Sequence, residues 1–201
     1  MRVGETKVKN IFYTRKSLFY LELSAVAFGL LYLIFIIIKK PIAWFFGILS
    51  SLLYIYIFYK TNLFFQSILQ LFYLVLGCYG WWSWTKQNQI KAHSWGIAKH
   101  LLLILIGLMI SLIGGKFYIT GQSMPFLDIF ISVFCVLATY LTTRAILENW
   151  YYWIVLNILS MILYHYSKLY LTEILFLGNL VLSVVGLIHW KKNTNLNPDY
   201  C

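Results

Sequence analysis

Four residues near the C-terminal end of the chain share one face of an expected helix and could bind a small molecule. Trp153, Asn157, Ser160 and Tyr164 follow one another at i, i+4, i+7 and i+11 in an otherwise apolar segment, which places them in one stripe. Lipid offers an amide no hydrogen-bond partner, so such a stripe is expected to face protein or a water-filled cavity. Its indole, amide and hydroxyls can stack on a flat ring and hydrogen-bond the polar groups that the ring carries.

Two further stripes of this kind lie on other apolar segments. One comprises Gln66, Gln70, Tyr73, Gly77, Gly80, Trp81 and Trp84. The other comprises Asp128, Ser132, Cys135, Thr139 and Thr142. The amides of Asn157 and Gln70 lie near the middle of their segments, so we expect both to contact substrate. The complete expected binding set is Gln66, Gln70, Tyr73, Trp153, Asn157, Ser160, Tyr164 and Asn179.

Several of these residues have an alternative role in helix packing. Small and polar side chains join transmembrane helices to one another, which is the alternative for Ser160, Ser132, Thr139, Thr142, Gly77 and Gly80. Aromatic residues near span ends commonly anchor a protein at the membrane interface, and we expect this of Trp82, Trp84, Trp150, Trp190 and Tyr151. Glu148 follows Arg144 by four residues, which predicts an ion pair at the membrane edge.

The charges restrict the ligand class. None of the 16 Lys and Arg residues lies near the centre of an apolar segment, whereas a phosphorylated ligand would need such a cation. A flat heteroaromatic compound bearing hydroxyls fits better, and indole faces would attract it if it were cationic. The four histidines form no catalytic or metal-binding motif, so we expect neither an enzyme nor a metal or other cofactor.

The composition shows which elements must position these residues. The chain of 201 residues is 61% hydrophobic and only 11% charged, whereas about a quarter of a soluble protein is charged. It is therefore expected to be an integral membrane protein in the lipid bilayer. Its net charge of +10 fits loops near anionic headgroups better than nucleic-acid binding, because the basic residues are scattered between apolar runs. The three cysteines match no disulfide framework.

Seven apolar runs are each long enough for a helix to cross the membrane. They cover roughly residues 17–38, 41–59, 63–84, 98–117, 125–147, 150–167 and 169–190. The positive-inside rule does not orient them, since Lys and Arg are equally divided between the two sides. If the N-terminal tail is excluded, the larger number lies on the side of the C-terminus, which we therefore expect to be cytoplasmic.

Two pairs of segments suggest an internal repeat. ILSSLLYIY at 48–56 resembles ILSMILYHY at 158–166 at a spacing of 110, and GWWSWTK at 80–86 resembles GLIHWKK at 186–192 at a spacing of 106. An offset of four spans means that both copies cross the membrane in the same direction, as in parallel-repeat transporters. We expect a 3+1+3 arrangement with a polar segment (1–16), a first bundle (17–97), a linker helix (98–117), a second bundle (125–190) and a polar tail (191–201).

Two longer stretches resemble the PnuC family of bacterial vitamin transporters. They are LQLFYLVLGCYGWWSW at 69–84 and ENWYYWIVLNILSMILYHYSKLYLT at 148–172, and the resemblance extends over roughly residues 41–192. It implies a SWEET-like fold in the bacterial inner membrane and facilitated diffusion of nicotinamide riboside, trapped afterwards by phosphorylation. It also implies that Gln70, Tyr73, Trp153, Asn157 and Tyr164 line the binding site.

Other functions stay open at this stage. Relatives within the family carry thiamine, and others are proposed to carry riboflavin or deoxynucleosides. Thiamine is a cationic aromatic compound like nicotinamide riboside, so the charge argument does not separate the two. A substrate-binding subunit of an ATP-driven vitamin importer is a further alternative, although such a subunit would not need a repeat. Formation of a homo-oligomer is also left open.

Overall fold

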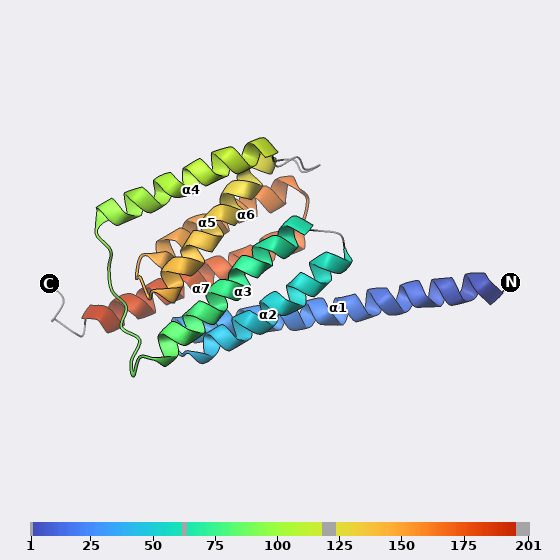
Figure 1. Cartoon of the computed structure of the whole chain (residues 1–201), viewed down its shortest axis with the longest axis horizontal. Helices are drawn as coiled ribbons and strands as arrows, with labels where there is room; N and C mark the ends of the chain where they lie inside the picture. The colour runs from blue at the N-terminus through green and yellow to red at the C-terminus, as the bar shows by residue number, and fades with distance from the viewer. Residues whose placement is uncertain (1, 62–63, 118–123, 196–201) are drawn as a thin grey trace.

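The structure is a computed structural model that describes residues 2–61, 64–117 and 124–195, with side chains for 18–61, 66–116, 124–170 and 172–192. Residues 1 and 196–201 of the expected terminal segments lie outside the described residues. The described chain confirms an all-α fold of seven helices (Figure 1). They are α1 (Arg2–Ile37), α2 (Ile42–Lys60), α3 (Phe64–Thr85), α4 (Ile97–Phe117), α5 (Pro125–Thr143), α6 (Asn149–Tyr166) and α7 (Tyr170–Asn195).

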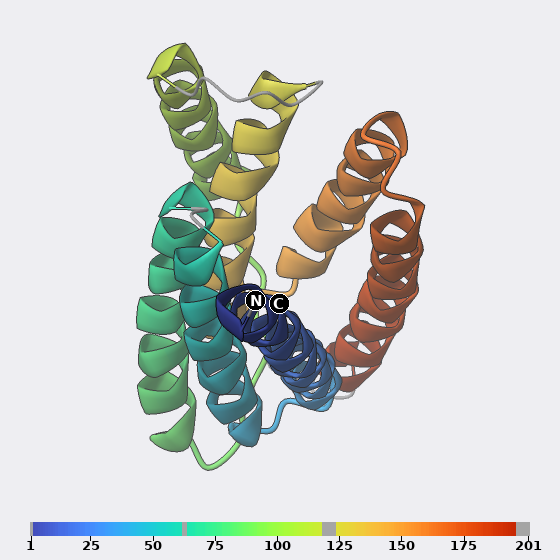
Figure 2. The same ribbon diagram turned by 90° about the vertical axis from the view of Figure 1, so that its right-hand side faces the viewer.

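Six of the helices follow one another around a ring. The helix pairs in contact are α1 with α2, α2 with α3, α3 with α5, α5 with α6, α6 with α7, and α7 with α1, and Figure 2 shows this order end-on. The remaining helix, α4, lies outside the ring and packs mainly on α5, and its His100 also contacts Tyr152 of α6. Figure 1 shows α1, α3, α5 and α7 running in one direction and the other three in the opposite direction. The first trio (α1–α3) and the second trio (α5–α7) therefore have the same sense.

Within the described residues, five of the seven helices are long and apolar enough to cross a membrane, namely α1, α2, α4, α5 and α7. The two that fall short, α3 and α6, carry seven of the eight expected binding residues. Amides, hydroxyls and indoles lower the mean hydropathy of those two helices, so the residues that suggest a binding site also weaken the membrane signal. That α3 and α6 also cross the bilayer remains a prediction.

Helix ends differ from the expected boundaries at several places. The fifth helix was expected to reach residue 147 but ends at Thr143, because Ala145 has a left-handed φ of 52° that an α-helix does not admit. Lys39, just after α1, has a closely similar φ of 55°. The first helix begins at Arg2 and the last continues to Asn195, so both extend into segments that we expected to be polar ends.

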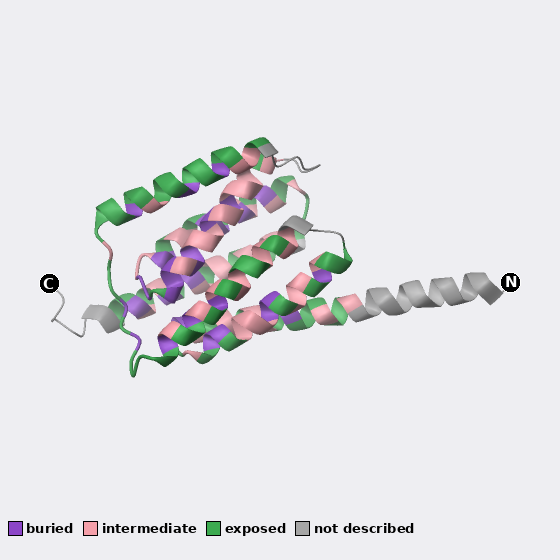
Figure 3. Ribbon diagram, in the orientation of Figure 1, coloured by how far each residue is buried: buried purple, intermediate pink, exposed green. Residues whose placement is uncertain are grey.

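Burial is concentrated at the end of the ring where α1, α3, α5 and α7 finish (Figure 3), which we call the Trp end. Four indoles meet there and are at most 1% exposed: Trp44, Trp84, Trp150 and Trp190. By contrast, α4 is exposed along most of its length in Figure 3, and its exposed residues are mainly leucine and isoleucine. Such a surface suits contact with lipid.

The Trp end is built twice, at a spacing of 106 residues. In each trio the first indole of the middle helix covers a glycine of the last helix and meets an indole four residues beyond that glycine. Both indole pairs have ring centroids 5.4 Å apart and an interplanar angle of 88°. The equivalent pairs are Trp44 and Trp150, Gly80 and Gly186, Trp84 and Trp190, and the left-handed Lys39 and Ala145.

Hydrogen bonds cross between the trios at this end. The indole Nε1 of Trp84 donates to the carbonyl of Thr143, 2.9 Å away, at the end of α5. The indole Nε1 of Trp190 donates to the carbonyl of Ile37, 3.0 Å away, at the end of α1. Both donors and both acceptors are again 106 residues apart. Each trio therefore donates an indole hydrogen bond to the C-terminal end of the first helix of the other trio. We call this arrangement the tryptophan clamp.

This register corrects one of the two expected repeats. The match between residues 80–86 and 186–192 has the spacing of 106 seen in the structure, whereas the match between 48–56 and 158–166 has a spacing of 110. The second alignment is displaced by four residues, which is about one helical turn. A shift of one turn keeps the same helix face aligned, so apolar residues still match. At the spacing of 106 residues, the counterpart of Asn157 in α6 is Ser51 in α2, and not the serine at position 50.

Two interpretations of residues near the span ends were wrong. Trp84, Trp150 and Trp190 are fully buried in the clamp and are not interface anchors. The exposed fractions of Trp82 (55%) and Tyr151 (43%) are compatible with anchoring.

The expected ion pair between Arg144 and Glu148 is also absent from the described residues. Arg144 donates to the hydroxyl of Tyr79 at 2.9 Å, and Glu148 instead accepts hydrogen bonds from the hydroxyl of Ser94 and the backbone N–H of Trp95. The reason is that the loop before α4 docks on the α5–α6 turn through a short backbone bridge between His93 and Ile146.

Candidate functional site

Two cavities lie among the helices of the ring. The first, which we call the Asn157 cavity, has a volume of about 250 Å³ and is lined from α1, α2, α5, α6 and α7. The second, the Gln70 cavity, has a volume of about 520 Å³ and is lined from α2, α3, α5, α6 and α7. Phe176 lines both, so the two cavities are adjacent. Small-molecule sites commonly occupy about 300–1,000 Å³, a size that the two reach together.

All eight expected binding residues line one of these cavities. Gln66, Gln70, Tyr73, Ser160 and Tyr164 line the Gln70 cavity. Trp153, Asn157 and Asn179 line the Asn157 cavity. Gln66 also borders a third, apolar cavity of about 440 Å³ between α3, α4 and α5, outside the ring. The structure thus brings together residues from three helices that are up to 113 positions apart in the sequence, although it distributes them over two spaces.

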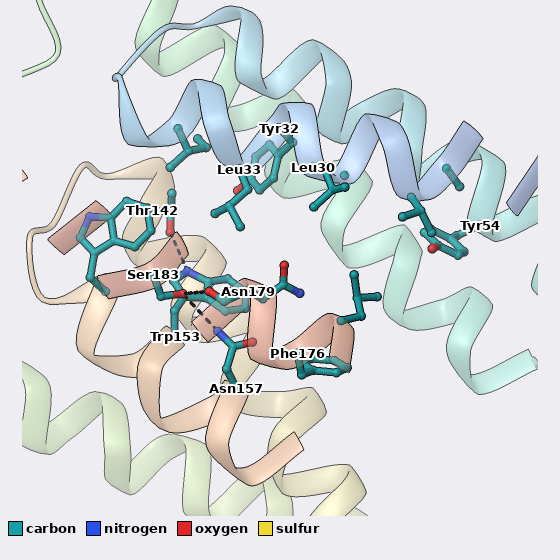
Figure 4. A pocket seen from close by; sticks show the side chains of 16 residues that line it. Leu30, Tyr32, Leu33, Tyr54, Thr142, Trp153, Asn157, Phe176, Asn179 and Ser183 are labelled. Atoms are coloured by element: carbon teal, nitrogen blue, oxygen red, sulfur yellow. Dashed lines mark hydrogen bonds between the residues drawn. The ribbon is translucent and has the colours of Figure 1, made fainter. Parts of the chain in front are cut away.

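Asn157 lines its cavity and is 4% exposed. Its amide Nδ2 donates to the hydroxyl of Ser183 at 3.1 Å, and that hydroxyl donates to the backbone carbonyl of Asn179 at 2.8 Å (Figure 4). This chain of bonds joins α6 to α7. One N–H of the Asn157 amide therefore serves helix packing. A primary amide has a second N–H and a carbonyl oxygen, and the side chain also lines the cavity.

Trp153 is held in place by a hydrogen bond within the second trio. Its Nε1 donates to the hydroxyl of Thr142 at 3.3 Å, and that hydroxyl lies 2.9 Å from the carbonyl of Ala138, to which it donates. The indole therefore has a fixed orientation on the cavity wall (Figure 4). Tyr32 of α1 and Tyr54 of α2 line the same cavity. Aromatic rings thus reach this space from both trios, as is needed to hold a flat ring.

The Gln70 cavity combines two aromatic rings with amides and hydroxyls. The ring of Tyr164 stacks on that of Phe176, with centroids 5.2 Å apart and an interplanar angle of 19°. The hydroxyl of Tyr73 and the thiol of Cys135 lie close enough to interact, and both residues line this cavity. Gln66 and Gln70 contribute two amides from α3. The Tyr164–Phe176 pair stands where the two cavities meet, since Phe176 belongs to both.

The lining of the two cavities has a distinctive charge. Among the described residues that line them there is no lysine or arginine, and Asp128 is the one carboxylate. The cavities therefore contain rings, amides, hydroxyls and a single acid. This set can stack on an aromatic ring, hydrogen-bond a sugar and attract a positive charge. It offers no cation to a phosphate group.

Several lining residues were not among those expected from the sequence. Asp128, Ser132 and Cys135 line the Gln70 cavity, and a signal for them existed, because all three belong to the polar stripe of the fifth apolar segment. Tyr32 and Tyr54 gave no such signal, because a tyrosine in a membrane segment rich in aromatic residues does not stand out. Thr139, a buried member of the same stripe, donates to the carbonyl of Cys135 and so serves its own helix.

Comparison with known proteins gives a consistent family. The model of the family described as nicotinamide mononucleotide transporter matches residues 19–192. The nicotinamide riboside transporter PnuC of Escherichia coli (strain K12) is 26% identical over 185 residues, covering 75% of this chain and 76% of that protein. The protein of the same name from Neisseria mucosa is 28% identical over 192 residues, covering 84% of this chain and 70% of its own.

A solved structure agrees with these relatives at the level of the fold. The crystal structure of the vitamin B3 transporter PnuC superimposes with a TM-score of 0.73 at 23% identity, covering 94% of this chain and 88% of that chain. The family match covers most of the sequence, including most of both trios and every described residue that lines the two cavities. The resemblance noted in the sequence is thereby confirmed, and this chain, a multi-pass membrane protein, belongs to the nicotinamide mononucleotide transporter family, which consists of transporters and not of enzymes.

Proposed function

We propose that this chain carries nicotinamide riboside across the bacterial inner membrane by facilitated diffusion, and that phosphorylation inside the cell then traps the riboside. The observation that carries the proposal is the lining of the two cavities, whose described residues include aromatic rings and amides, one carboxylate, and neither lysine nor arginine. Nicotinamide riboside is a pyridinium cation on an uncharged ribose. Its ring can stack on Trp153 or Tyr164, and its hydroxyls and carboxamide can pair with the amides of Asn157 and Gln70.

The same lining selects between the riboside and its phosphorylated form. The family description names the mononucleotide, whereas the similar proteins from Escherichia coli and Neisseria mucosa are named for the riboside. A phosphate dianion in these cavities would lie near Asp128 and would meet no basic side chain among the described lining residues. Burying an unpaired charge of this kind is costly, which favours the unphosphorylated ligand.

Calorimetry on the purified protein tests the choice of ligand. We expect heat of binding with nicotinamide riboside and none with nicotinamide mononucleotide at the same concentration. Riboflavin and thiamine serve as the alternative vitamins. Binding of the mononucleotide as tightly as the riboside, or binding of thiamine alone, would overturn the proposal.

The transport mode has its own test. The trios are proposed to rock against each other and to expose the cavities to each side in turn. No ATPase partner is needed, so uptake into liposomes should proceed without nucleotides, and collapse of proton and sodium gradients should leave the initial rate unchanged. A requirement for an ATPase would instead support a substrate-binding subunit of an importer.

The distribution of charge supports an orientation. If the five basic residues within the first 16 positions are excluded, the basic residues at the Trp end are Lys39, Lys40, Lys86, Lys91, Lys99, Arg144, Lys191 and Lys192, whereas those at the opposite end are Lys60, Lys116 and Lys168. The positive-inside rule then favours a cytoplasmic Trp end and C-terminus. Labelling of single cysteines from outside the cell at positions 116 and 192 tests this, and labelling at position 192 alone would contradict it.

A further inference from the structure

Asp128 lines the Gln70 cavity at the end of the bundle opposite the tryptophan clamp. It belongs to the first turn of α5, three residues after Pro125. It lines the cavity together with Gln66 and Ser167, which also lie near helix ends there, while Tyr73, Cys135 and Ser160 line the cavity further in. The cavity therefore extends from the level of this carboxylate toward the middle of the bundle.

The carboxylate is placed so that its charge acts on the cavity. Asp128 and Tyr164 line the same space, and the charge of Asp128 acts on the Tyr164 hydroxyl. The N-terminal turn of a helix favours a negative charge through the aligned backbone dipoles. Charges interact more strongly in such a partly enclosed site than in water. An anion thus acts on any ligand that enters beside Tyr164.

The repeat supplies a natural comparison for this residue. Glu22 of α1 lies 106 positions before Asp128, the same spacing that relates the two halves of the tryptophan clamp. Glu22 is exposed and belongs to the lining of neither cavity, although its charge acts on Tyr54. The two trios thus carry an acid at equivalent positions, but of the two, Asp128 alone belongs to the described lining of a cavity.

We propose that Asp128 is the residue by which this carrier selects a positively charged ligand over an uncharged ligand of similar shape. Asp128 adds electrostatic attraction that depends on the ligand's charge, whereas Asn157, Gln70 and the aromatic rings recognise features that both ligands share. The role presupposes the cationic riboside proposed above. Removal of the Asp128 carboxylate is then expected to abolish the preference for the cationic ligand, while binding of an uncharged analogue persists.

The test compares nicotinamide riboside with its reduced form, dihydronicotinamide riboside, in which the ring carries no charge. Dissociation constants are measured by calorimetry for the wild type, Asp128→Asn and the matched control Glu22→Gln. We expect the wild type and Glu22→Gln to prefer the cation by about tenfold or more, and Asp128→Asn to prefer it by less than about threefold. The affinity of Asp128→Asn for the reduced riboside should stay within about twofold of the wild-type value, which also shows that the variant is folded.

Two results overturn the role of Asp128. One is an unchanged preference for the cation in Asp128→Asn, and the other is an equal loss of affinity for both ligands, which would indicate a structural role. The same titrations with thiamine and thiochrome, its uncharged oxidation product, separate this inference from the proposed substrate. Binding of the thiamine pair alone would reject nicotinamide riboside as substrate, and the effect of Asp128→Asn on that pair would still decide the role of the carboxylate.

Discussion

The two trios are nearly the same at the Trp end and differ in the middle. At the Trp end, equivalent positions carry the same residues with the same ring geometry, namely Trp44 and Trp150, Gly80 and Gly186, and Trp84 and Trp190. In the middle, the same register pairs unlike residues: Gly47 with Trp153, Ser51 with Asn157, Gln70 with Phe176, and Tyr73 with Asn179. Packing between two similar halves is satisfied by similar residues. A ligand with no symmetry of its own needs a wall on which the halves differ.

The clamp should be equally important in both trios. Trp84→Ala and Trp190→Ala each remove a fully buried indole and a hydrogen bond to the other trio, so each should lower the free energy of unfolding by about 3–5 kcal/mol. Thermal unfolding of the purified variants measures this, with Trp82→Ala, 55% exposed, as the control that should change little. A large loss in one variant alone would show that the two halves of the clamp are not equivalent.

The glycines beneath the indoles give a finer comparison. A Cβ atom at Gly80 would lie 2.4 Å from the Trp44 ring, and one at Gly186 would lie 2.4 Å from the Trp150 ring. Gly80→Ala and Gly186→Ala should therefore each destabilise the protein by about 1–3 kcal/mol through overpacking. Gly178→Ala is the control, because a Cβ there meets nothing within 4 Å. If Gly178→Ala costs as much as the other two, close packing is not the reason for these glycines.

The middle of the bundle should respond asymmetrically. Asn157→Leu is expected to weaken binding of nicotinamide riboside at least about tenfold, or about 1.4 kcal/mol, because a polar group of the ligand loses its partner. Ser51→Ala, at the equivalent buried position of the first trio, should leave the dissociation constant nearly unchanged. Calorimetry compares the two. If Asn157→Leu lowers thermal stability but not affinity, its bond to Ser183 is its whole function.

The smallest expected effect concerns the turns that follow α1 and α5. Ala145 has a φ of 52°, which is unfavourable for a residue with a Cβ, so Ala145→Gly should stabilise the protein by about 0.5–1 kcal/mol. The equivalent Lys39→Gly should gain less, because it also removes an ammonium group that lies 5.2 Å from the Trp190 ring. Thermal unfolding distinguishes them, and a larger gain at Lys39 would contradict the comparison.

Much of the fold could be predicted from the sequence because long apolar runs and polar breaks determine where helices lie in a membrane. The register of the repeat in α2 and α6 could not, since an error of one helical turn preserves the apolar face. The burial of Trp84, Trp150 and Trp190 could not be predicted either. An indole near a span end is equally suited to anchoring at the membrane interface and to packing in a clamp. Glu148 was assigned a nearby partner, whereas its actual partners come from a loop more than 50 residues away.

The binding set was predictable for a different reason. A mid-span amide is costly in lipid, so Asn157 and Gln70 had to face the interior, and both line cavities there. The division of the set between two adjacent spaces was not predictable, because it depends on how α7 places Phe176 against Tyr164 of α6. The contributions of Tyr32 and Tyr54 likewise depend on the first trio closing against the second.

Competition during uptake tests the central claim most directly. Liposomes containing the purified protein are supplied with labelled nicotinamide riboside, and unlabelled riboside or mononucleotide is added in excess. If a ring-lined space without basic residues selects the ligand, unlabelled riboside abolishes uptake of label and the mononucleotide leaves the rate unchanged. Equal inhibition by the mononucleotide would contradict the account.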